Sequence, residues 1–182
     1  MSDRRPGIRP RASLVRRLDI SARLAVPVAS TALLLLLLSA PLGLPGQAEL
    51  QVAVALCCVF FWSLFRPGSM PPPTVFLLGL LGDLLGYAPP GVGVLSLLIV
   101  HGVALRWRRQ LVRQGFGVVW LAFLGIAFGA AALAWIVTSL LEFRLLPPAA
   151  AMFQAVLTAG LYPPLAVLLT HAHQTVAEPD HA

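Results

Sequence analysis

Six apolar runs, separated by short polar or proline-rich links, make up most of this chain. They cover residues 24–44, 50–65, 74–87, 92–105, 116–143 and 147–170. Apolar runs with so few charged residues are typical of transmembrane helices, which need about 20 residues to cross the hydrocarbon layer. The pattern predicts an all-α membrane protein in which residues 23–170 form a bundle of about six transmembrane helices.

The third and fourth runs are shorter than a standard span. Each would form about 21 Å of helix, against a hydrocarbon thickness of about 30 Å. The two helices could span the membrane with local thinning, or they could form a re-entrant pair. The link at 88–91 has the sequence APPG, which predicts a tight antiparallel hairpin in either case.

One carboxylate, Asp83, interrupts the third run. Because an ionisable group at membrane depth costs about 2.5–3.5 kcal/mol, it normally faces protein or trapped water, so Asp83 needs a partner. Gly79, Gly82 and Gly86 share one side of the predicted helix and would let another helix approach closely. Asp83 could fix the register of this packing seam, or it could handle a proton or a substrate.

Depth along the helices suggests which groups could contact Asp83. Ser96 lies as far from the cytoplasmic end of its run as Asp83 does, about 13.5 Å, so Ser96 is the best partner within the hairpin. Thr158, at mid-depth in the sixth run, is a second candidate. His101 is shallower and close to several arginines, and we expect it at the membrane interface.

Composition agrees with the hydropathy pattern. Of the 182 residues, 58% are hydrophobic and 11% charged, which is far from the composition of a soluble domain. All thirteen basic residues are arginine, and with six crossings all but Arg144 fall on one side. The positive-inside rule makes that side cytoplasmic, so both termini are expected inside.

The polar ends of the chain should lie outside the bundle. Residues 1–22 are rich in Arg and Pro, which predicts a disordered cytoplasmic arm near lipid headgroups. Residues 171–182 are expected to form an unstructured cytoplasmic tail.

The basic surface should be largest between the fourth and fifth runs, where we predict an inner loop. It contains Arg106, Arg108, Arg109 and Arg113. The loop could anchor the topology, dock an acidic or amphipathic cytoplasmic partner, or do both. Aromatic interleaving and nucleic-acid motifs are missing, so we expect contact with anionic lipid and none with nucleic acid.

A second face for close packing is predicted in the fifth run. Gly125 and Gly129 form a GxxxG pair, and Ala132 continues it by one turn. This face could pack inside the bundle or receive the helix of a single-span partner.

The sequence lacks the residues that several classes of enzyme and channel require. An intramembrane aspartyl protease needs a second membrane Asp, and the sequence has no phosphate-binding loop, metal box or Ser/His protease arrangement. Channels need repeated polar rings, which this chain cannot supply. We therefore expect no enzymatic activity, no cofactor and no metal.

Taken together, these features resemble the MreD family of rod shape-determining membrane proteins. The resemblance covers about residues 24–170, and its most specific part is the stretch FLLGLLGD at 76–83, followed by a Pro/Gly link and an arginine-rich inner loop. The resemblance implies a fold similar to the substrate-binding subunits of energy-coupling-factor vitamin transporters.

The same resemblance implies a function without catalysis. Members of that family bind MreC, a single-span periplasmic coiled-coil protein, in the complex that links MreB filaments to peptidoglycan synthases. The expected function is therefore a scaffold for cell elongation in the bacterial inner membrane. A substrate-binding subunit of a small-molecule transporter is the alternative, with a water-accessible pocket near Asp83, and a lipid-handling protein is a third class.

Overall fold

The computed structural model describes residues 14–40, 43, 45–86 and 89–177, which form six α-helices, one short 3-10 helix and no strand. The α-helices are α1 (Leu14–Ser39), α2 (Gln47–Phe65), α3 (Pro72–Leu85), α4 (Val92–Leu111), α5 (Phe116–Leu141) and α6 (Pro148–Ala177), and the 3-10 helix η1 is Pro67–Ser69. The predicted all-α class is confirmed.

Three of these helices are long and apolar enough to cross a membrane. They are Gln47–Phe65, Phe116–Leu141 and the part of α6 from Pro148 to His171, and two shorter apolar segments are Ala25–Ser39 and Pro72–Leu85. The chain therefore has the character of a multi-pass membrane protein. Six crossings remain a prediction.

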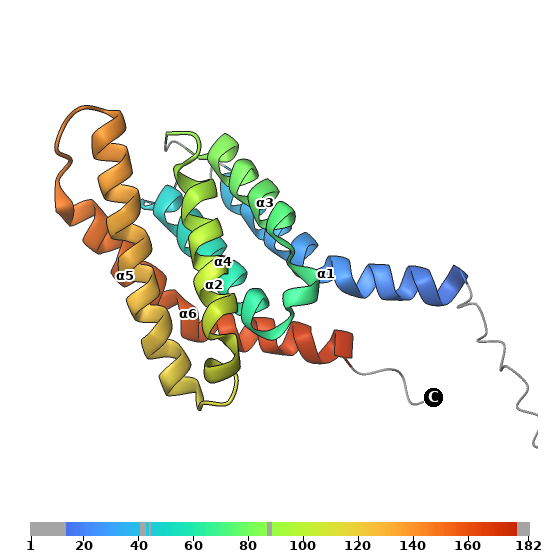
Figure 1. The fold of residues 1–182 in the computed structure, drawn as a ribbon. Coiled ribbons are helices and arrows are strands. Elements are labelled where there is room, and N and C mark those ends of the chain that lie inside the picture. Colours follow the sequence, from blue (N-terminus) through green and yellow to red (C-terminus); the bar gives the residue numbers. More distant parts are fainter. Residues whose placement is uncertain (1–13, 41–42, 44, 87–88, 178–182) are drawn as a thin grey trace, which may run out of the picture.

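Helices α3, α4 and α5 pack side by side in an up-and-down arrangement (Figure 1). The α3–α4 and α5–α6 links lie at one end, which we call the Asp83 end. The α4–α5 link lies at the opposite end, which we call the arginine end (Figure 1). Residues near the start of α4 and α6 and near the end of α3 and α5 therefore meet at the Asp83 end.

The polar ends of the chain are more helical than predicted. Helix α1 begins at Leu14, inside the arm predicted to be disordered at 1–22, and residues 1–13 lie outside the described part. Residues 14–22 contain no proline, so nothing in this stretch interrupts a helix that leads into the apolar run. At the other end α6 continues to Ala177, because the first proline after His171 is Pro179. Residues 178–182 of the predicted tail also lie outside the described part.

The arginine loop is also shorter than predicted. Helix α4 continues beyond residue 105 to Leu111, so Arg106, Arg108 and Arg109 lie on its last turns and only Arg113 lies in the link. Arginine is a good helix former, and a positive charge near a helix C-terminus interacts favourably with the helix dipole. Both effects extend the helix past the end of the apolar run.

Helix α2 is the centre of the bundle. It packs against α1, α3, α4 and α6, and every residue from Ala53 to Leu64 is buried. A helix that is apolar on all sides is expected in such a central position. Helix α5 is peripheral by comparison. Of its apolar 18-residue segment 28% is buried, against 72% for the corresponding segment of α2.

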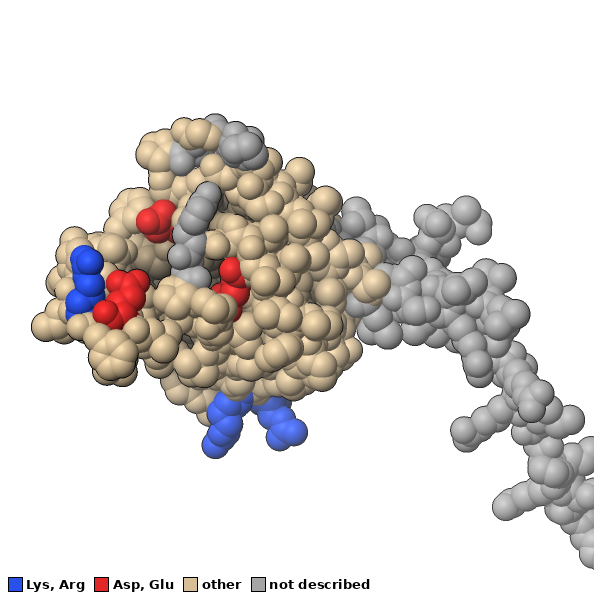
Figure 2. Space-filling view, turned by 90° about the horizontal axis from the view of Figure 1, so that it is seen from above, with Lys and Arg blue, Asp and Glu red and all other residues tan. Residues whose placement is uncertain are grey.

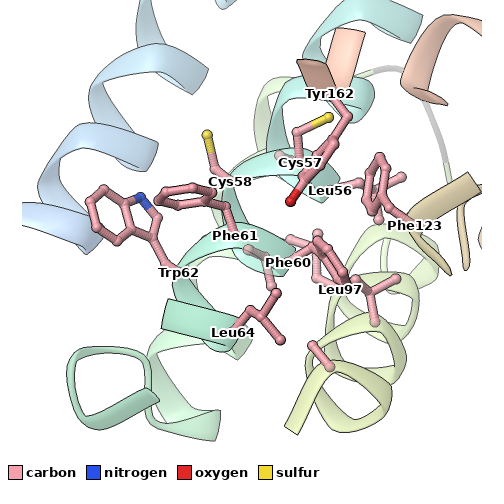
Figure 3. Packing of buried hydrophobic residues seen from close by; sticks show 14 of the residues in the cluster. Leu56, Cys57, Cys58, Phe60, Phe61, Trp62, Leu64, Leu97, Phe123 and Tyr162 are labelled. Atoms are coloured by element: carbon pink, nitrogen blue, oxygen red, sulfur yellow. The ribbon is translucent and has the colours of Figure 1, made fainter. Parts of the chain in front are cut away.

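An aromatic cluster joins three helices near the middle of the core. Phe60 of α2, Phe123 of α5 and Tyr162 of α6 have ring centroids 4.4–5.6 Å apart, and Figure 3 shows their rings pointing toward one another. Aromatic pairs at such distances add about 0.5–1.5 kcal/mol to the effect of area burial. The cluster fixes α5 and α6 against the central helix.

Candidate functional site

The Asp83 carboxylate binds the first turn of helix α4. Its Oδ2 accepts hydrogen bonds from the backbone N–H groups of Gly91 (2.7 Å) and Val94 (3.3 Å), and its Oδ1 accepts one from Gly93 (2.9 Å). Asp83 lies two residues before the end of α3, so this contact closes the α3–α4 hairpin. The side chain acts as an N-terminal cap that is supplied by a neighbouring helix.

The local sequence explains why α4 needs this cap. The first N–H groups of a helix have no acceptor within the helix, and an N-cap side chain usually provides one. Here the N-cap residue is Gly91, whose φ of 99° suits glycine and which has no side chain to accept a bond. The carboxylate of Asp83 supplies the acceptor, and its negative charge also interacts favourably with the helix dipole.

Two glycines allow α3 and α4 to come this close. A Cβ atom at Gly79 would lie 2.6 Å from the Cα of Val94, so only glycine fits against the α4 backbone there. A Cβ atom at Gly93 would overlap Oδ1 of Asp83. Gly79 was among the residues expected in a packing seam, whereas the need for Gly93 becomes visible only when Asp83 is placed.

The predicted glycine seam of α3 is shorter than expected. A Cβ atom at Gly82 would meet nothing within 4 Å, and one at Gly86 would meet only the backbone oxygen of Gly82. Gly82 lies about 60° around the helix from Gly79, enough to take it off the line of contact with the α4 backbone, and Gly86 follows the last helical residue, Leu85. Gly82 and Gly86 instead line the cavity described below.

The two expected partners of Asp83 are replaced by backbone groups. The hydroxyl of Thr158 donates to the backbone oxygen of Gln154 (2.7 Å) and accepts from the Gln154 amide (3.1 Å). Ser96 is buried and lines the same cavity as Asp83, but within the described part of the chain its hydroxyl does not bond the carboxylate. The depth argument placed Ser96 correctly near Asp83 but could not detect the unpaired N–H groups of α4.

A cavity of about 250 Å³ lies beside Asp83 and is partly open. All six α-helices contribute lining residues, and Leu35 is the one from α1. Figure 2 shows this end of the molecule from above, with acidic side chains exposed on it. The polar residues that line the cavity are Glu49, Gln51, Asp83, Ser96, Thr138 and Gln154.

Four of these polar residues were not part of the predicted site, and they are Glu49, Gln51, Thr138 and Gln154. Glu49 and Gln51 lie in the first turns of α2, and Gln154 lies in the second turn of α6, where its amide donates to the backbone oxygen of Glu49 (3.1 Å). Their distance along the chain from Asp83 hides the relationship. The available signal was that both helices begin at the Asp83 end, so polar groups in their first turns meet there.

The glycines of α5 lie on an uncovered face of the described bundle. Gly125 and Gly129 are exposed, and a Cβ atom at either would meet nothing within 4 Å. Leu121, Phe128 and Ile136 are exposed on the same helix. The sequence left open whether this face packs inside the bundle or receives the helix of a partner. In the described bundle it does not pack against another helix of this chain.

At the arginine end, one of the four predicted surface arginines has a structural contact. Arg108 is half-buried, and its Nε donates to the backbone oxygen of Leu64 (2.8 Å), in the last turn of α2. This bond satisfies a C-terminal carbonyl that has no partner within the helix. Arg106, Arg109 and Arg113 are exposed.

His101 is buried inside the bundle. Its exposed fraction is 3%, and its Nδ1 lies 2.7 Å from the Ser63 hydroxyl of α2. Helix α4 faces the central helix at this position, and the depth of His101 in a membrane stays a prediction. Neither Ser63 nor His101 lines the cavity beside Asp83, so this pair joins α2 to α4.

Comparisons with known proteins identify no relative. No protein-family model matches the chain, and no curated protein and no solved structure is significantly similar to it.

Proposed function

We propose that this chain is a non-catalytic scaffold of the bacterial cell-elongation complex, as the resemblance to MreD implies. In this proposal it crosses the inner membrane about six times, with both termini in the cytoplasm. Its partner is an MreC-like protein whose single transmembrane helix packs against the bundle. MreB and peptidoglycan synthases belong to the same complex.

The observation that carries the proposal is the uncovered small-residue face of α5. Lipid-facing helix surfaces are commonly covered by bulky apolar side chains, whereas small residues spaced by four allow a second helix to approach closely. Gly125 and Gly129 have this spacing, and no side chain of the described chain covers them. A partner helix would gain close backbone contact there that lipid cannot provide.

The contacts of Asp83 support a structural role for this residue, and hence a scaffold, more than a role in proton or substrate transfer. Three backbone N–H groups hold its carboxylate, and two of the bonds are shorter than 3.0 Å. A group held in this way suits a fixed structural connection better than repeated proton transfer.

The exposed arginines support an orientation with this end in the cytoplasm. Arg106, Arg109 and Arg113 are exposed together at the end opposite Asp83. Basic residues next to membrane segments favour the cytoplasmic side and attract anionic lipid.

Affinity purification from membranes tests this proposal. The full chain with a C-terminal tag, extracted in mild detergent from a rod-shaped bacterium, should recover a single-span periplasmic coiled-coil protein in constant ratio. Deleting the gene should produce rounded cells. Recovery of no such partner, together with normal rod shape after deletion, would contradict the scaffold proposal.

The cavity beside Asp83 favours the alternative, a substrate-binding subunit of a small-molecule transporter. Ligand sites in proteins are mostly apolar with a few convergent polar groups, and this cavity has that character. Native mass spectrometry of the purified protein separates the two functions. A stoichiometric small molecule, co-purifying with an ATPase module and without a coiled-coil partner, would favour transport.

A further inference from the structure

We propose that the cavity beside Asp83 binds a small organic cation, namely an amine with an apolar body and one oxygen that accepts a hydrogen bond. The site is distinct from the α5 face, so the proposal goes beyond the scaffold function and does not depend on it. Under the transporter alternative it would name the class of substrate.

The apolar walls and the size of the cavity limit the ligand. Its inner surface is formed largely by aliphatic side chains, which are Leu35, Val52, Ala55, Leu56, Val92 and Leu97. Its volume of about 250 Å³ lies just below the range of about 300–1,000 Å³ that is usual for drug-sized ligands. A compact apolar group such as one aromatic ring with a short side chain therefore fits the space.

The charged groups of the cavity favour a cation. Glu49 and Asp83 both line it and are half-buried, and no arginine is among the lining residues that the structure describes. Asp83 is already held by the N–H groups of α4, but Glu49 has no ion pair within the described part of the chain. A carboxylate with limited access to water is stabilised by a nearby positive charge, and an ammonium group would provide it.

A buried amide near Glu49 indicates the hydrogen-bond acceptor. Gln51 also lines the cavity, and its exposed fraction is 5%. No group of the described chain bonds its Nε2, and this nitrogen is itself buried. A buried donor without an acceptor costs about 1–3 kcal/mol, so such donors are uncommon unless another molecule pairs with them. Rotation of the amide would turn Nε2 toward the cavity, where a hydroxyl or carbonyl oxygen next to the amine would accept its hydrogen bond while the ammonium faces Glu49.

A series of matched compounds tests the charge and the acceptor on the unmodified protein. Binding is measured by titration calorimetry with the full chain in lipid nanodiscs, and empty nanodiscs correct for partition into lipid. The compounds are phenylalaninol, which has amine and hydroxyl, 2-phenylethylamine, which lacks the hydroxyl, 3-phenyl-1-propanol, which lacks the amine, and the anion 3-phenylpropionate. We expect saturable binding in the order phenylalaninol, 2-phenylethylamine, phenylpropanol, with none for the anion.

Two variants assign the binding to the cavity. Glu49→Gln should weaken phenylalaninol binding at least about tenfold, as expected when a charge pair with limited solvent access is lost, and should not affect phenylpropanol. Gln51→Leu should remove the advantage of phenylalaninol over 2-phenylethylamine. Glu142→Gln is the matched control, because Glu142 is exposed at the same end but does not line the cavity, and it should change nothing.

Other outcomes would overturn the proposal. These are the absence of saturable binding by all four compounds, equal binding of the amine and the anion, or full binding in Glu49→Gln. Neither the compounds nor the variants involve the α5 face, so failure here would leave recovery of a coiled-coil partner unchanged. Loss of that partner with intact amine binding would instead contradict the scaffold function alone.

Discussion

The Asp83 carboxylate occupies the space that a side chain at Gly93 would need. Oδ1 of Asp83 accepts a hydrogen bond from the N–H of Gly93 at 2.9 Å, and a Cβ atom on Gly93 would overlap that same oxygen. The two residues come from different helices, ten positions apart in the chain. Their fit makes the start of α4 depend on the end of α3.

Gly93→Ala should therefore destabilise the protein although alanine favours helices. Alanine gains up to about 1 kcal/mol over glycine inside a helix, but overlap with the carboxylate must displace Asp83 and break its bonds. We expect a net loss of about 1–3 kcal/mol in the free energy of unfolding, measured by denaturant titration in mixed micelles.

Gly102→Ala is the matched control for this substitution. Gly102 lies in the same helix, and a Cβ atom there would meet nothing within 4 Å. It should leave stability unchanged or raise it by up to about 1 kcal/mol. Equal effects of the two substitutions would mean that Asp83 does not occupy the space beside Gly93.

Replacing Asp83 separates its role as an acceptor from its role as a charge. Asp83→Leu removes the acceptor for three N–H groups and should cost about 1–3 kcal/mol. Asp83→Asn keeps one acceptor oxygen but turns an amide toward N–H donors, so we expect an intermediate loss. Thermal unfolding followed by tryptophan fluorescence would rank the three proteins, and an Asn variant as unstable as the Leu variant would point to charge as the main contribution.

The helices were predictable because this fold is built from apolar runs of nearly helix length. The predicted run at 50–65 became Gln47–Phe65, and the run at 116–143 became Phe116–Leu141. The errors fall where polar residues continue a helix beyond its apolar part, as at Leu14 and Leu111. Hydropathy marks where a chain prefers lipid, whereas helix ends depend on caps and on proline.

The candidate site was predictable only in part. The cost of a lone carboxylate correctly singled out Asp83, and spacing correctly placed Gly79 in a tight helix contact. The partner of Asp83 was missed because side chains were compared with side chains, while its acceptor oxygens bind the backbone of α4. Gln51 was missed because the cavity forms only where all six helices meet, which no single stretch of sequence records.

The two glycines of α3 that share a predicted face should respond differently to alanine. Gly79→Ala places a Cβ atom 2.6 Å from the Cα of Val94, so α3 and α4 must separate, at a cost of about 1–3 kcal/mol. Gly82→Ala points into open space at the cavity and should be neutral or slightly stabilising. Denaturant titration of both variants checks this difference, and a larger loss at Gly82 would restore the longer seam that the sequence suggested.

Bulky residues on α5 should block a partner without unfolding the chain. Leucine at Gly125 and Gly129 meets no neighbour in the described bundle, so Gly125→Leu with Gly129→Leu should keep the unfolding midpoint of the unmodified protein. A partner helix packed on these glycines would lose close contact, so its recovery by affinity purification should fall at least about fivefold, equivalent to roughly 1 kcal/mol. Gly160→Leu, also exposed and uncovered on α6, is the matched control and should recover the partner normally. If the double variant also recovers it normally, the partner binds another surface, because the only change is bulk on the face of α5.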